Sequence, residues 1–356
     1  MIKSQKVKIG LGTFNLVKGI GVLVIIFVHM TTRYSLERVP QLVPLYLMLR
    51  VLGGGLLSMF FMISGIQFKP KPIKIMLKKT FSEMMIPYLW GGLGCYVFYL
   101  ALNWPFIEWD NLRYCSQLLL GAFVLGLPKP ITFMAHDLFS TQALWFFMAM
   151  FIAFNLLNLI LKADRAPVQI LLAILCAGIG YVLLRLDFVY YCIPQGMMAT
   201  GFCYAGYVIK QQKLIDRLIN SVWTYAILVP VYLLMAAYGS FDLAAGDFTL
   251  LEYVGALFSA ILFILLGVFG SRITWVGLDQ LKKIGMYSYW IICIHGVEML
   301  VCPYYAMVEA LSDHSPLWAF GIEVILKILI LSTGCRILKK ISQEKYKKKK
   351  QVLAEM

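Results

Sequence analysis

Long apolar stretches recur along the chain and decide what it can fold into. Each is between 17 and 25 residues long, and they occupy residues 11–30, 42–66, 81–103, 142–161, 168–184, 188–209, 221–239, 249–270, 284–302 and 316–337. A helix of about 20 apolar residues crosses the hydrocarbon core of a bilayer. Only 14% of the residues are charged, whereas a soluble domain carries about 25%. The pattern excludes a soluble enzyme, a secreted disulfide scaffold, a disordered chain and a DNA-binding domain. It predicts an all-α, polytopic membrane helix bundle of about ten transmembrane helices.

Three features of these stretches need a separate interpretation. The first stretch is too long for a signal peptide and ends without a small-residue cleavage site, so we expect an uncleaved first helix. Between residues 104 and 142 the central apolar run, 118–127, is too short to span, and a re-entrant or interfacial piece is expected there. The triplet Gly53–Gly55 lies inside the second stretch and predicts close contact with another helix.

Basic residues fall on alternate loops. If the N-terminus is cytoplasmic, the loops and tail on that side carry Lys69, Lys71, Lys74, Lys78, Lys79, Lys162, Arg165, Lys210, Lys213, Arg217, Arg272, Lys282, Lys283, Arg336, Lys339, Lys340, Lys345, Lys347, Lys348, Lys349 and Lys350. The opposite side carries only Arg33, Arg38, Arg113, Lys129 and Arg185, and most of its segments are acidic. This distribution follows the positive-inside rule and predicts that both termini are cytoplasmic.

The net charge of +14 therefore follows from membrane topology, and no nucleic-acid partner is predicted. We expect a membrane domain at residues 1–340 and a basic cytoplasmic tail at 341–356, in contact with water or lipid headgroups. The sequence holds no zinc, Walker or Rossmann motif, so we predict no metal cofactor. Cys115 and Cys302 fall near the same membrane face and are a candidate disulfide pair.

Ionisable residues inside a bilayer are costly and are therefore functional candidates. The first stretch carries Lys18 toward its inner half and His29 near its outer end. Eleven residues return to within about 20° of the same helix face, with a rise of about 16.5 Å. One face thus carries a cation on the inner side and a titratable imidazole on the outer side. A snorkelling lysine and a histidine at the headgroup level are an equally good interpretation.

Further charges lie in or at the ends of the predicted spans: Arg50, Glu83, Glu252, Glu298, Glu323 and Lys327. Glu323 and Lys327 are four residues apart and are expected to pair with each other. Arg50 has no local partner, so we expect it to face the bundle interior, a cavity or an acid on another helix. His295 precedes Glu298 by three residues, a spacing that favours a paired core histidine over a catalytic one.

Short motifs follow one another over nearly the whole chain. A basic residue, ten intervening residues and a histidine stand in the first stretch, and later come Phe60–Gly65, Ile86–Tyr88, Leu144–Phe146, Gly201–Tyr207 and Ile284–His295. In this order they resemble the motifs of the acyltransferase-3 family of integral membrane acyltransferases, including its FFFISG, IPY, LWFL and LGxxSLxIYLLH stretches. Two positions depart from the family pattern: Asn15 stands where an aspartate is frequent, and Glu83 where an arginine is frequent.

The resemblance implies transfer of an acyl group, usually acetyl, from cytoplasmic acyl-CoA to a hydroxyl of an envelope glycan or lipid-linked sugar. The protein would then lie in the bacterial cytoplasmic membrane, in contact with lipid. His29 is expected to act as general base, and Lys18, Lys78 and Lys79 to bind the phosphates of the acyl donor. The candidates for the lining of the site are Asn15, Arg50, Ser64, Tyr88, Trp145, His295 and Glu298.

Two other classes of protein fit part of the pattern. A transporter or flippase also has about ten spans with charges inside the membrane, although the sequence shows neither an internal repeat nor a matched pair of broken helices. A non-catalytic membrane domain of the same fold is the second alternative. The acceptor, the acyl chain length and the oligomeric state stay open.

Overall fold

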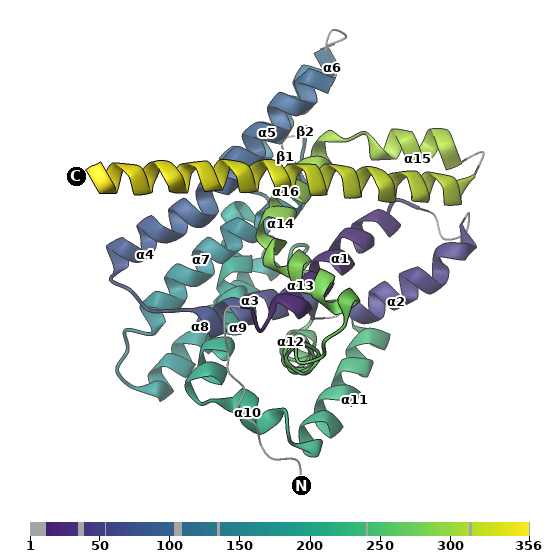
Figure 1. The fold of residues 1–356 in the computed structure, drawn as a ribbon. Coiled ribbons are helices and arrows are strands. Elements are labelled where there is room, and N and C mark those ends of the chain that lie inside the picture. Colours follow the sequence, from purple (N-terminus) through teal and green to yellow (C-terminus); the bar gives the residue numbers. More distant parts are fainter. Residues whose placement is uncertain are drawn as a thin grey trace.

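Helices make up nearly all of the structure, a computed structural model that describes residues 12–34, 39–53, 55–102, 109–133, 136–239, 241–312 and 315–355 (Figure 1). The helices of the first half are α1 (Asn15–Thr31), α2 (Val43–Gly53), α3 (Leu56–Gln67), α4 (Ile73–Thr80), α5 (Ile86–Leu102), α6 (Trp109–Leu119), α7 (Trp145–Ile160) and α8 (Ala166–Arg185). Those of the second half are α9 (Ile193–Gln211), α10 (Leu214–Leu218), α11 (Val222–Tyr238), α12 (Leu250–Gly270), α13 (Val276–Met286), α14 (Ser288–Val301), α15 (Tyr304–Ser312) and α16 (Pro316–Glu355). The predicted all-α fold is confirmed, apart from one short hairpin.

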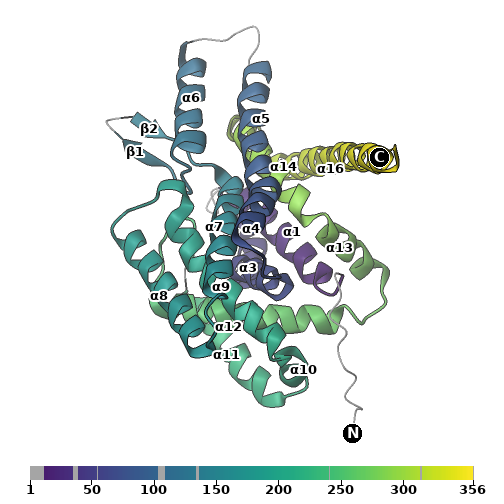
Figure 2. The same cartoon turned by 90° about the vertical axis from the view of Figure 1, so that its left-hand side faces the viewer.

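That hairpin lies in the long segment after α5. Strands β1 (Ile131–Phe133) and β2 (His136–Leu138) are antiparallel, with Thr132 opposite Asp137. Before it, α6 runs beside α5 and ends in a π-helical turn, Leu120–Val124. The two helices project together from one end of the bundle, with the hairpin beside them (Figure 2). The apolar run 118–127 thus forms the end of a helix and a turn rather than a helix of its own.

Most of the predicted apolar stretches correspond to helices of membrane length. In the described part of the chain, six segments are long and apolar enough to cross a bilayer: Pro40–Gln67, Ile73–Leu102, Gln142–Ile160, Ala166–Arg185, Leu250–Gly270 and Pro316–Lys340. The bent pair α13–α14 adds a seventh if it counts as one span, and α1 and α11 are apolar but shorter. The protein is therefore a multi-pass membrane helix bundle, while the number ten and the orientation of the termini stay predictions.

The second apolar stretch is broken rather than continuous. Helix α2 ends at Gly53, and α3 begins after Gly55, whose φ of 98° only glycine adopts readily. Gly55 packs against Ser259 of α12, whereas Gly53 has open space where a Cβ would be. The contact that the glycine triplet predicts is thus made at Gly55, and the triplet also interrupts the helix. Gly54 and Arg38 lie outside the described residues.

Two glycines set the crossing of α3 and α9 in the centre of the bundle. A Cβ on Gly65 would overlap the carbonyl oxygen of Cys203, and a Cβ on Gly206 would overlap that of Met62. Each helix therefore places a glycine against the backbone of the other, which permits an approach that a side chain would prevent. The two motifs that contain these glycines are in this respect packing motifs.

The outer helices expose apolar side chains. On α8 these include Ile170, Leu171, Ile174 and Leu175, and α16 runs along one side of the bundle with much of its apolar surface uncovered (Figure 1). Such a continuous apolar exterior suits contact with lipid. Because α16 continues unbroken to Glu355, the predicted membrane domain and basic tail share one helix.

The structure corrects the predicted cysteine pair and gives Glu252 a different role from the one that the sequence suggested. The eight cysteines are all free, so Cys115 and Cys302 form no disulfide. Glu252, singled out as an intramembrane charge, belongs to a capping box at the start of α12. The Glu252 carboxylate accepts from the backbone N–H of Thr249, and the Thr249 hydroxyl oxygen accepts from the backbone N–H of Glu252. Its carboxylate satisfies helix-end donors.

Candidate active site

Helix α1 carries both residues that the sequence singles out. Lys18 lies in its first turn and His29 in its last, and both are half-buried. The His29 ring lies beside the ring of His295 on α14, with 5.5 Å between ring centroids and 47° between the planes. The first and last motifs of the chain thus meet in the interior through their histidines.

His295 and Glu298 form a buried pair that Lys327 completes. Their side chains are 1% and 2% exposed, and His295 Nδ1 lies 2.7 Å from Glu298 Oε1. Lys327 of α16 donates from Nζ to the same carboxylate oxygen. The pairing that the i,i+3 spacing favours is therefore present. It occurs beside His29, where His295 also contacts a second imidazole.

Glu323 connects this pair to the residues that follow the C-terminal end of α1. Its carboxylate accepts from Arg33 at 2.5 Å and from the hydroxyl of Tyr34 at 3.1 Å. Lys327 lies 3.9 Å from Glu323, so the predicted i,i+4 pair exists, but Glu323 lies closer to Arg33 and Lys327 lies closer to Glu298. Tyr304 covers both cations, with its ring centroid 5.0 Å from the Arg33 guanidinium and 4.3 Å from Lys327 Nζ.

Six polar residues from three helices and one adjoining turn therefore form one buried assembly, which we name the three-helix cluster: His29 of α1 and Arg33 in the turn after it, His295 and Glu298 of α14, and Glu323 and Lys327 of α16. Two cations face two carboxylates. The cluster is neutral when both histidines are neutral, and this balance limits the cost of burying charge.

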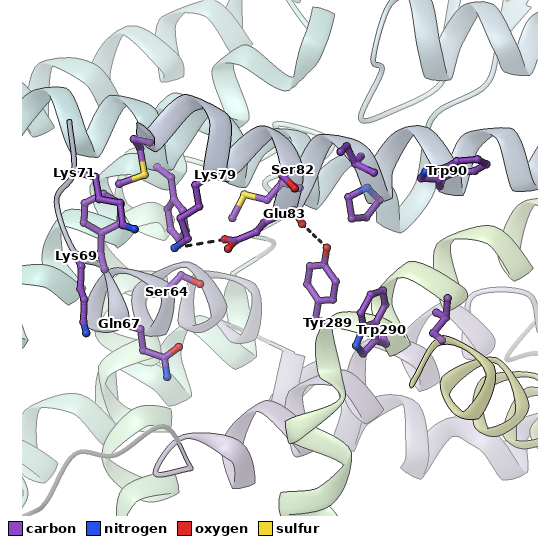
Figure 3. A pocket seen from close by; sticks show the side chains of 17 residues that line it. Ser64, Gln67, Lys69, Lys71, Lys79, Ser82, Glu83, Trp90, Tyr289 and Trp290 are labelled. Carbon is purple, nitrogen blue, oxygen red and sulfur yellow. Dashed lines mark hydrogen bonds and ion pairs between the residues drawn. The ribbon is translucent and has the colours of Figure 1, made fainter. Parts of the chain in front are cut away.

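A pocket of about 1360 Å³ opens at the other end of α14 (Figure 3). Its polar and aromatic lining includes Ser64, Gln67, Lys69, Lys71, Lys79, Ser82, Glu83, Trp90, Tyr289 and Trp290. Three lysines face one carboxylate there, so the pocket is basic. Lys79 and Glu83 are 3.5 Å apart and both are about half exposed.

Two structural devices shape the wall of this pocket. The side-chain amide of Asn158 accepts from the backbone N–H of Lys71 and donates to its carbonyl, both at 2.9 Å, which holds the basic loop. Between α4 and α5 the helix widens into a π-helical turn, Phe81–Met85, where the Glu83 carbonyl accepts from the Tyr289 hydroxyl. Such turns are frequent at functional sites.

Helix α14 links the pocket to the three-helix cluster. Tyr289 and Trp290 line the pocket, and His295 follows five residues after Trp290 on the same helix. At 1.5 Å per residue, His295 is about 8–9 Å further along the helix axis. The pocket and the cluster thus occupy successive levels of one helix.

The structure brings together part of the predicted set. His29, His295 and Glu298 meet in the cluster, and Ser64 and Lys79 line the pocket. Ser64 also donates to the Phe60 carbonyl at 2.8 Å, a bond within its own helix. The remaining candidates, Asn15, Lys18, Tyr88, Lys78 and Trp145, are not among the residues that line the pocket.

Arg50 does not lie where the sequence places it. It is exposed on α2, and its guanidinium reaches the carbonyl of Ala237 near the end of α11 at 3.4 Å. Because the helix carbonyls near a C-terminus are unsatisfied, they offer this cation a partner without an acid. Of the three surroundings expected for Arg50, the structure shows neither the bundle interior nor an acid on another helix, because its side chain is exposed and its partner is a backbone carbonyl.

Trp145 and Tyr88 are both buried, in segments of the chain that pack against α14. Trp145 begins α7 directly after Leu144, whose side chain packs against Gly296, the residue that follows His295. Tyr88 follows Pro87, which lines the pocket. Within the described residues, no group of three or more His, Cys, Asp or Glu side chains is arranged to hold a metal ion.

Comparison with protein families matches residues 11–335 to the acyltransferase domain of the acyltransferase-3 family. The match covers nearly the whole chain, and the protein therefore belongs to this family of acyltransferases. No curated protein and no solved structure matches the chain.

Proposed function

We propose that this protein moves an acyl group, with acetyl as the expected case, from acyl-CoA to a hydroxyl of an envelope glycan or lipid-linked sugar. We place it in a bacterial cytoplasmic membrane, with the basic pocket on the cytoplasmic side. The observation that carries the proposal is the half-buried His29, held beside His295 above a basic pocket.

The pocket suits the nucleotide end of the donor. Lys69, Lys71 and Lys79 offer charge-assisted hydrogen bonds to phosphate oxygens, and the aromatic rings of Trp90 and Trp290 offer faces for a planar base. Since α14 leads from this pocket toward His295, the pantetheine arm has a direction in which to extend. Lys18 and Lys78 are further candidates for the donor phosphates, from α1 and α4.

The chemistry assigned to His29 is proton transfer. In its neutral form His29 takes the proton from the acceptor hydroxyl, and the oxygen attacks the thioester carbonyl. The tetrahedral intermediate collapses with cleavage of the C–S bond, and the imidazolium returns its proton to the leaving thiolate. Trp145 and Tyr88 are the proposed donors to the oxyanion, since an indole N–H and a phenol O–H both donate.

Membranes that contain the protein and radiolabelled acetyl-CoA provide the test. We expect base-labile label in the envelope glycan fraction with the wild type, and about a hundredfold less with His29→Gln, because general-base catalysis contributes at least about that factor. The variant His136→Gln, in the β1–β2 hairpin, is the matched control and should incorporate normally. Incorporation by His29→Gln at the wild-type rate would contradict the role of His29.

A further inference from the structure

We infer that His295 is a positioning residue for His29, with Glu298 fixing its tautomer so that its Nε2 accepts the N–H of His29. The inference rests on the proposed role of His29 as general base. It assigns to the buried His295–Glu298 pair a function in the reaction rather than in packing alone.

The hydrogen bond to Glu298 decides which nitrogen of His295 carries the proton. A carboxylate only accepts, and Glu298 Oε1 lies 2.7 Å from His295 Nδ1, so Nδ1 is the protonated nitrogen. A neutral imidazole has one donor and one acceptor. The charge balance of the three-helix cluster favours the neutral ring, because a protonated His295 would add a third cation beside Lys327 and Arg33.

The other nitrogen of His295 lacks a partner. Nε2 is buried and makes no hydrogen bond among the described residues, and a buried acceptor without a donor costs about 1–3 kcal/mol. The neighbouring ring is that of His29, at 5.5 Å between centroids. An N–H of His29 directed at Nε2 would satisfy this acceptor.

This arrangement leaves one nitrogen of His29 bare. When one ring nitrogen donates to His295, the other carries the lone pair that accepts the substrate proton. The order of groups, Glu298 to His295 to His29, repeats the logic in which a third group orients a base. Here the orienting group is an imidazole, which is itself oriented by a carboxylate.

Lys327 holds the carboxylate of Glu298 in place. It donates to the oxygen that faces His295 and is in turn balanced by Glu323, which Arg33 neutralises. Loss of Glu298 alone would leave Lys327 short of a counter-charge, and such a variant can fail to fold. The double variant Glu298→Leu/Lys327→Met removes one charge of each sign, so the cluster stays neutral, and it leaves no acceptor at position 298 for the N–H of His295 Nδ1.

The tautomers can be measured directly by ¹⁵N NMR of ring-labelled histidine in the purified full-length protein. The chain has four histidines, so a parent with His136→Gln and His314→Gln retains His29 and His295 alone. We expect His295 in the parent to be protonated at Nδ1 and bare at Nε2. In the double variant this preference should be lost, whereas the exposed Glu309→Gln, on α15, should leave it unchanged.

Activity provides the second readout. We expect His295→Leu to lower kcat by about tenfold or more, as loss of a tautomer-fixing group does in other catalytic constellations, with KM for acetyl-CoA within about twofold. His295→Gln should recover part of this loss, because its amide oxygen still accepts an N–H. His295→Leu should also mix the tautomers of His29 in the NMR spectrum.

Two results would overturn the inference. One is a His295 tautomer that is the same in the parent and the double variant, and the other is wild-type kcat in His295→Leu while His29→Gln is inactive. A fully active His29→Gln would instead contradict the proposed function. The two failures are distinguishable, since the NMR measurement needs no acyl transfer.

Discussion

Lys79 is the pocket residue whose charge the structure partly neutralises. Glu83 lies 3.5 Å away on the next turn, so an arriving phosphate competes with a carboxylate for the same ammonium. Lys69 and Lys71 have no acid within ion-pair distance among the described residues. The pocket therefore carries uncompensated positive charge on Lys69 and Lys71 before the donor binds. When the donor binds, Lys79 can exchange Glu83 for a phosphate group.

The substitution Lys79→Ala tests this charge. We expect KM for acetyl-CoA to rise about tenfold with little change in kcat, because a hydrogen bond to a charged group contributes about 1.5 kcal/mol. Initial rates of label transfer at several donor concentrations measure it. Lys283→Ala, an exposed lysine of α13 outside the pocket, is the control. A lower kcat at unchanged KM would place Lys79 in the chemistry instead.

At the residue scale the sequence indicates candidate residues, but it does not indicate which residues contact them. Lys18 and His29 stand out because an ionisable residue in an apolar helix is costly, and such a residue can be recognised from the local sequence. The contact of His29 with His295 cannot be recognised in this way, since 266 residues separate them. The surroundings of Arg50 were not predicted for the same reason. Its guanidinium donates to a carbonyl near the end of α11, and the sequence around Arg50 does not indicate this partner.

At the scale of elements, the crossing of α3 and α9 depends on Gly65 and Gly206. Both stand in motifs that resemble those of the family, and each faces backbone rather than the pocket. A residue with a Cβ at either position must push the helices apart. Because Cys203 and Met62 present carbonyl oxygens there, no side-chain rotation relieves the overlap.

The variant Gly65→Val should therefore destabilise the fold by about 3 kcal/mol, at the upper end of overpacking costs. Thermal unfolding in detergent, followed by size-exclusion chromatography with fluorescence detection, measures it. Gly178→Ala on α8, where nothing lies within 4 Å of the new Cβ, should instead be neutral or gain up to about 1 kcal/mol from helix propensity. Equal effects of the two changes would show that the crossing does not depend on close approach.

Helix positions were predictable because hydrophobicity and length are local. The stretch 249–270 is α12 at Leu250–Gly270, and 168–184 is α8 at Ala166–Arg185. Interruptions within these helices were harder to predict from the sequence. The break before α3 needs the left-handed Gly55, and the π-helical turn Phe81–Met85 leaves no change in apolar content. The capping box of Glu252 did carry a signal, Thr249 followed three residues later by glutamate.

At the scale of the whole molecule, the orientation of the bundle decides which compartment the pocket faces. Pro72 is exposed in the basic loop beside Lys71, and Asp247 is exposed in the segment between α11 and α12. The positive-inside rule assigns these two residues to opposite sides of the membrane. A donor made in the cytoplasm needs the first of them on the inside.

Cysteine accessibility tests this orientation. In intact cells a membrane-impermeant maleimide should label Asp247→Cys and leave Pro72→Cys unlabelled until the membrane is permeabilised. The parent protein is the background control, because its own eight cysteines are free. Labelling of Pro72→Cys in intact cells would reverse the topology and remove the pocket from cytoplasmic acyl-CoA.

The three-helix cluster also has a consequence for how the chain is assembled. Arg33, just after α1, and Glu323 of α16 are 290 residues apart, and Lys327 supplies the charge that Glu298 of α14 faces. During synthesis α1 emerges long before α16, whereas α14 is separated from α16 only by the short helix α15. Until that last helix arrives, Arg33 and Glu298 lack these partners, so the cluster can close only once the ribosome has delivered it. Insertion of α16 is therefore the step that completes the cluster, and a chain truncated before it would keep Arg33 and Glu298 in the membrane without the charges of Glu323 and Lys327.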